Sequence, residues 1–99
     1  MMAFNMSSPA DVMADLAGRA KRRRIDSDLT QRELAAKAGV SYSSLRVFED
    51  TGKASLETVV RIAFVLGAEA EFAKLFPSRA PRTIDDIADR PLRQRVRKS

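Results

Sequence analysis

The sequence contains neither cysteine nor histidine, and these two absences remove several kinds of function at once. Without cysteine there is no disulfide scaffold and no thiolate metal site. Without histidine the chain lacks the commonest zinc ligand and the commonest general base. No activating partner for a serine nucleophile is evident, and the four glycines are isolated rather than gathered in a phosphate-binding loop. We therefore expect no enzymatic activity and no cofactor.

Long apolar runs are also missing. The longest uninterrupted apolar stretch is only a few residues, too short to span a membrane. No Lys or Arg precedes Arg19, which is unlike a secretory signal peptide. These features predict a cytoplasmic protein without membrane contact.

Charge is distributed unevenly along the 99 residues, a length that fits one domain. Residues 1–76 are nearly neutral, whereas residues 77–99 carry seven Lys/Arg against three Asp/Glu. The net charge of +5 suits a polyanionic partner but does not choose among DNA, RNA and a membrane surface. The chain has one tyrosine and no tryptophan, so it lacks the aromatic platform on which many RNA-binding domains stack bases.

Proline is absent between residues 10 and 76, which is typical of a compact helical body. No window alternates apolar and polar residues as a strand would. We predict an all-α fold of five helices, preceded by a flexible segment at residues 1–8 and followed by a basic, flexible tail at residues 77–99. The five predicted helical segments are residues 9–25, 30–38, 41–49, 55–66 and 69–76.

Several helix ends carry recognisable signals. Ser8 is a plausible N-cap ahead of Pro9 at the favoured first position. Thr30 with Glu33 three residues later forms a capping-box pattern. Gly39 is expected to end its helix in a left-handed conformation.

Apolar residues recur at helical spacing and predict the buried faces. In the first segment these residues are Val12, Met13, Leu16, Ala17 and Ala20. In the fourth segment they are Leu56, Val59, Val60, Ile62, Ala63 and Leu66.

Residues 29–49 read LTQRELAAKAGVSYSSLRVFE, two short helical runs separated by a turn of small residues. Each run is too short to be stable alone, since isolated helices below about 12–15 residues are marginal in water. One apolar stripe comes from Leu34, Ala35 and Ala38, and the other from Leu45 and Phe48. This arrangement is typical of a helix-turn-helix.

The same stretch resembles the helix-turn-helix of the Cro and C1 repressors, also called the Xre family. The matching residues are Gln31, the triplet Glu33-Leu34-Ala35, Gly39, Leu45 and Glu49. The resemblance covers roughly residues 16–72. It implies a lambda-repressor-like bundle within a DNA-binding domain at residues 9–76.

By this resemblance the third helix enters the major groove and its outward side chains contact DNA. Tyr42, Ser43, Arg46 and Val47 are expected to read bases, while Gln31 and Lys53 are expected to bind phosphates. The complete predicted set of DNA-binding residues is Gln31, Ser41, Tyr42, Ser43, Ser44, Arg46, Val47 and Lys53. Any single member could instead be a helix cap or a solvated side chain.

The resemblance also implies an ion pair between Arg24, late in the first helix, and Glu49, at the end of the third. The alternative is that Arg24 merely belongs to the basic run RAKRRR at residues 19–24.

In many repressors of this type a glycine follows two residues after the glutamate, but here Gly52 comes three after Glu49. This shifted loop, the helix ASLETVVRIAFVLG, the ending LFP and the Arg-rich tail resemble the HipB-type antitoxins. That resemblance implies an autorepressor that also binds a HipA-like kinase toxin.

One short recognition helix reads few base pairs, so we expect a homodimer on a palindromic double-stranded operator. Phe72, Leu75 and Phe76 are candidates for the dimer contact, although they could instead close the core over the fourth helix. The tail could add nonspecific DNA affinity, or it could fold onto a protein partner through Ile84, Ile87, Leu92 and Val96. The competing function is a protein-interaction module that neutralises a partner and binds nucleic acid only nonspecifically.

Overall fold

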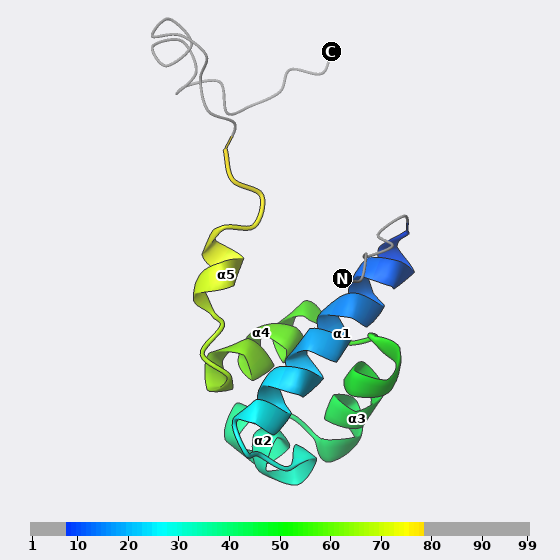
Figure 1. Cartoon of the computed structure of the whole chain (residues 1–99), viewed down its shortest axis with the longest axis vertical. Coiled ribbons are helices and arrows are strands. Elements are labelled where there is room, and N and C mark those ends of the chain that lie inside the picture. The colour runs from blue at the N-terminus through cyan, green and yellow to red at the C-terminus, as the bar shows by residue number, and fades with distance from the viewer. Residues whose placement is uncertain (1–7, 79–99) are drawn as a thin grey trace, which may run out of the picture.

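The computed structural model describes residues 8–78, and this part of the chain consists of helices without a strand. The five helices are α1 (Pro9–Asp26), α2 (Gln31–Ala38), α3 (Tyr42–Thr51), α4 (Leu56–Val65) and α5 (Ala70–Ala73). Helix α1 is the long rod of the bundle, and α5 leads away from it (Figure 1). The predictions for residues 1–7 and 79–99 lie outside the described residues.

Four of the helices begin at a Ser or Thr whose side chain accepts a hydrogen bond from the first turn. Thr30 and Glu33 form the complete capping box, with N···O distances of 3.0 and 2.9 Å. Ser8, Ser41 and Ser55 cap α1, α3 and α4 in the same way. These caps satisfy backbone donors that would otherwise be left unpaired at a helix start. The predicted starts of these four helices are therefore confirmed.

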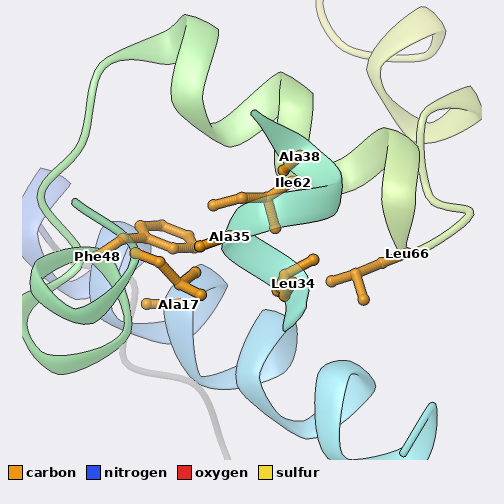
Figure 2. Packing of buried hydrophobic residues seen from close by; sticks show 8 residues of the cluster. Ala17, Leu34, Ala35, Ala38, Phe48, Ile62 and Leu66 are labelled. Atoms are coloured by element: carbon orange, nitrogen blue, oxygen red, sulfur yellow. The ribbon is translucent and has the colours of Figure 1, made fainter. Parts of the chain in front are cut away.

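The core lies where α1, α2, α3 and α4 meet. Its largest fully buried side chains are Phe48, Leu34, Leu45 and Ile62. Leu66 and three smaller side chains complete the cluster, as Figure 2 shows: Ala17, Ala35 and Ala38. Helix α1 packs on α3, and α2 packs on both α3 and α4. Full burial of one large apolar side chain stabilises the fold by about 1.5–3 kcal/mol, so these few residues hold the two short helices together.

Polar contacts join the far end of α4 to α1. The Arg23 guanidinium donates to the carbonyl oxygens of Leu66, at 3.1 Å, and Gly67, at 3.3 Å. A cation at a helix C-terminus is favourable, because the last carbonyls carry partial negative charge. This contact fixes α4 against α1 without entering the core.

The fifth helix is much shorter than predicted. It forms a single turn at Ala70–Ala73 instead of residues 69–76, and no side chain caps its start. Phe76 has φ 55° and precedes Pro77, a neighbour that disfavours helical backbone. Leu75 and Phe76 are 53% and 91% exposed, so they do not close the core.

Three other sequence predictions need correction. The third helix extends to Thr51, two residues past the predicted end, because the left-handed residue that stops it is Gly52. The apolar spacing predicts buried faces that include Leu56 and Val12, yet these residues are 69% and 39% exposed. Leu56 is the first residue of α4 and Val12 lies near the start of α1; helix ends are covered less than helix centres. None of the helices within residues 8–78 combines the length and the apolar character of a membrane-spanning segment.

Both the backbone conformation at residue 52 and the packing around it favour glycine at this position. Its φ is +86°, and an added Cβ would lie 2.8 Å from the carbonyl carbon of Met13 on α1. We expect Gly52→Ala to lower the free energy of unfolding by about 2–4 kcal/mol, since left-handed strain and a backbone clash act together. Urea denaturation of the purified protein would measure the change.

Two other glycines provide matched controls for this substitution. Gly67 has φ +72° but open space around its Cα, so Gly67→Ala should cost only about 1–2 kcal/mol. Gly18 lies inside α1 with open space, and Gly18→Ala should be neutral or stabilise by about 0.5–1 kcal/mol. Equal losses for Gly52→Ala and Gly67→Ala would contradict the close contact between α1 and the end of α3.

Candidate nucleic-acid interface

A buried hydrogen-bond network fixes α3 relative to α1 and α2. The Arg24 guanidinium makes a bidentate contact with Glu49, with Nε to Oε2 at 2.8 Å and Nη2 to Oε1 at 3.0 Å. The two side chains are only 10% and 1% exposed. The expected ion pair is therefore present, and Arg24 is not simply one more solvated member of the basic run.

The same network reaches the start of α2. Arg24 Nη1 donates to the Leu29 carbonyl oxygen at 2.9 Å, and Gln31 Nε2 donates to Glu49 Oε1 at 2.9 Å. Within the described residues, every buried side-chain nitrogen and oxygen has a hydrogen-bond partner. One carboxylate thus connects α3 with α1 and with the first residue of α2.

Gln31 was predicted to bind a phosphate, and the structure gives its side-chain amide an internal partner. The contact with Glu49 holds Gln31 at the junction of α2 and α3, where it is half-buried. Sequence reasoning did not foresee this packing role, because the residues are 18 positions apart.

The outward side of α3 carries a short, chemically mixed surface. Ser43, Arg46 and Val47 are exposed there, whereas Tyr42 is half-buried. The Ser43 hydroxyl can form a hydrogen bond with a base edge, and the Arg46 guanidinium can donate to guanine O6 and N7. The isopropyl group of Val47 can contact a thymine methyl. These groups are spaced along one helix face, which is the form that the major groove of duplex DNA admits.

The serines at the start of α3 divide into different roles. Ser41 is the N-cap: its hydroxyl accepts from Ser44 N at 3.0 Å and donates to Ser44 Oγ at 2.8 Å. Ser43 Oγ lies 3.4 Å from Ser41 Oγ, a weak contact. Ser41 is therefore engaged in capping, and of the three serines Ser43 is held most loosely.

A second surface adjoins α3 on the side of α4. An open groove of about 420 Å³ is lined by Ser43, Ser44, Val47, Lys53, Ala54, Ser55 and Thr58. The loop between the helices is ordered by Thr51, whose hydroxyl donates to the Val47 carbonyl at 2.7 Å and accepts from Lys53 N at 3.1 Å. This bond places Lys53 directly beyond the end of α3, at the edge of the groove.

On the opposite flank, α3 meets a residue that sequence reasoning missed. The Cζ atom of Arg32, on α2, lies 4.0 Å from the centroid of the Tyr42 ring. Arg46, one turn after Tyr42, lies 5.7 Å from the same centroid. Cation–π contacts at exposed sites are worth about 0.5–1 kcal/mol each. In the sequence, only its position next to Gln31 marks Arg32 as a candidate for DNA binding. Its contact with Tyr42 depends on the angle between α2 and α3.

These features together define a class of protein. Two short helices are joined by a left-handed glycine, Gly39 with φ +72°, and the second helix is exposed along its outer face. A buried network and a small core hold the pair rigid. This is the architecture of a helix-turn-helix domain, which presents its second helix to the major groove.

Comparison with known proteins agrees with this assignment. A family model described as helix-turn-helix matches residues 21–72, just over half of the chain. The chain therefore belongs to the Cro/C1-type helix-turn-helix family, whose members are DNA-binding transcription regulators. A search of curated proteins finds no match. The family match overlaps most of the region, about residues 16–72, over which the sequence resembled this family.

The ion pair can be tested by comparing two arginines of α1. Arg24→Ala should lower the free energy of unfolding by about 3–5 kcal/mol, because it strands the buried Glu49 carboxylate. Arg22→Ala, at an exposed position of the same helix, should change it by less than about 0.5 kcal/mol. Thermal and urea unfolding of both variants measure this difference, and equal stabilities would rule out the proposed role of Arg24.

Proposed function

We propose that this protein is a sequence-specific repressor that binds a palindromic duplex operator as a homodimer. The observation that carries the proposal is the outer face of α3, where Ser43, Arg46 and Val47 stand exposed on a helix fixed by Glu49. Rigid presentation matters because a base contact discriminates only when its donors and acceptors are held in register with the groove.

In this proposal the contacts divide by their partner on the duplex. Ser43, Arg46 and Val47 read base edges from the centre of the face, with Tyr42 beside them. Lys53 binds a phosphate next to the open groove between α3 and α4, and Ser44 contributes a hydroxyl to the same groove. The side chains of Gln31 and Ser41 are used in hydrogen bonds within the protein. Near these two residues, the groups that contact a phosphate are the backbone N–H groups at the starts of α2 and α3.

Binding to DNA upstream of this protein's own gene tests the proposal. A footprint should protect two half-sites whose centres lie about 34–36 Å apart, one helical turn. Arg46→Ala should weaken binding to that duplex by about 5- to 150-fold, the value of one bidentate base contact, and should weaken binding to random duplex much less. Electrophoretic shift titrations measure the dissociation constants for the upstream duplex and for the random duplex.

Lys37→Ala is the control for that titration, since Lys37 is a cation in the last turn of α2. It should leave the affinity of both duplexes nearly unchanged. Equal affinity of the wild-type protein for upstream and random duplex would refute the repressor proposal and favour a module that binds protein partners.

Exposed apolar side chains support the dimer. Leu75 and Phe76 follow α5 at 53% and 91% exposure, and Phe64 on α4 is 63% exposed. Large apolar groups left in water are favourable to bury against a second copy. Phe72, the third candidate for the dimer contact, is half-buried.

Phe76→Ser should convert the dimer to a monomer at micromolar concentration, as measured by sedimentation equilibrium. The melting temperature of the monomeric unit should hardly change, because the Phe76 side chain is almost fully exposed within one copy of the chain. Phe48→Ser, at a buried core position, is the contrasting variant and should unfold the domain. A wild-type protein that sediments as a monomer would overturn the dimer.

The finer proposal is that the protein is the antitoxin of a HipA-like kinase and represses the operon that encodes both. It rests on the resemblance of the shifted loop and the following helix to HipB-type antitoxins. In the structure Gly52 is the C-cap of α3, so the shifted glycine allows the helix to run to Thr51 before the chain turns. A kinase-like reading frame beside this gene would support the proposal, and its absence would remove that support.

A further inference from the structure

Two cations converge on one aromatic ring at the edge of the recognition helix. Arg32 and Arg46 both place their guanidinium carbon within 5.7 Å of the Tyr42 ring centroid, and both side chains are exposed. They come from different helices, Arg32 from the first turn of α2 and Arg46 from the middle of α3. Tyr42 is the first residue of α3, so its ring stands where the two helices approach.

Stacking leaves the hydrogen-bonding edge of a guanidinium free. The N–H groups of arginine lie in its plane, whereas a contact with an aromatic ring uses its face. Among residues 8–78, neither Arg32 nor Arg46 has an ion-pair partner. By contrast, four arginines in this part of the chain have guanidinium groups that donate hydrogen bonds to side-chain or backbone oxygens: Arg19, Arg23, Arg24 and Arg61.

Two like charges held beside one ring repel each other, and an anion between or beside them relieves that repulsion. A phosphodiester fits the planar donor fork of arginine in bidentate form. Arg32 also lies in the first turn of α2, where unpaired backbone N–H groups favour negative charge. The two features point to the same ligand chemistry at the same edge.

We infer that Arg32 binds a phosphate of the duplex, and that Tyr42 is the positioning residue that holds it there. This inference rests on the proposed function and deepens it, because it extends the contact surface from α3 onto α2. Tyr42 thereby has a task besides reading a base: its ring sets the direction of a cation ten residues earlier in the chain.

The salt dependence of DNA binding tests the role of Arg32. The full-length protein is titrated with the upstream duplex and with a random duplex of equal length, between 50 and 200 mM salt. Arg32→Ala should flatten the slope of log K against log salt by about 0.9, which is a three- to fourfold smaller loss of affinity over that range. The effect should be equal on both duplexes, because a phosphate carries no sequence. Lys37→Ala, a matched loss of charge on the same helix, should leave the slope unchanged.

Coupling between Arg32 and Tyr42 tests the positioning role. Tyr42→Phe keeps the ring, so Arg32→Ala should flatten the slope as much in that background as in the wild type. Tyr42→Ala removes the ring, and Arg32→Ala should then have less than half of its wild-type effect. Circular dichroism at the assay temperature checks that each variant is folded.

The outcomes separate the two proposals. If the wild-type protein does not prefer the upstream duplex, the repressor proposal fails, while the random duplex still reports on Arg32. If Arg32→Ala and Lys37→Ala give the same slope, the phosphate contact is refuted. If Arg32→Ala affects only the upstream duplex, Arg32 reads a base and the inference is wrong. If the effect of Arg32→Ala is the same without the ring, Tyr42 does not position it.

Discussion

The buried contact between Arg24 and Glu49 is the constraint on which the rest of this domain depends. Three helices must keep their relative positions, although α2 has eight residues and α3 ten, lengths at which isolated helices are not stable. The Glu49 carboxylate accepts from both Arg24 and Gln31. Such a buried pair is costly to dehydrate and is useful mainly because it permits one arrangement. Here that arrangement points the outer face of α3 away from the core.

That face has two chemically different flanks. Toward α2 lie the Tyr42 ring and two guanidinium groups, whose charge suits the phosphate backbone. Toward α4 lies a groove rich in hydroxyls with Lys53 at its edge. Arg46 on the first flank, and Val47 and Ser43 on the second, offer the variety of side-chain chemistry on which the proposed base contacts depend. A helix with cationic side chains on both sides suits the proposed position in a DNA groove, since each groove wall is a phosphate strand.

The end of the described chain differs in kind from this rigid centre. Helix α5 is one turn, and Leu75 and Phe76 extend into solvent instead of covering α4. The centre therefore folds around its own core, whereas this segment has apolar surface to offer to another molecule. In the proposed homodimer a second copy would match the symmetry of a palindromic operator, and the proposed toxin partner would use the same kind of surface. In the proposed function, this division puts the contacts with DNA and the contacts with a protein partner on separate parts of the chain.

Local chemistry in the sequence was enough to locate most of the fold. Ser8, Thr30, Ser41 and Ser55 each cap a helix, and Gly39 ends one, because these signals act within a few residues. Periodicity correctly placed Leu34, Leu45, Phe48 and Ile62 in the core. The exposure of Phe76, the internal partner of Gln31 and the stack of Arg32 on Tyr42 were decided only by the tertiary structure. The contacts of Gln31 and Arg32 depend on the distance and angle between separate helices, and the exposure of Phe76 depends on where the chain runs after α5. No local spacing of residues encodes either.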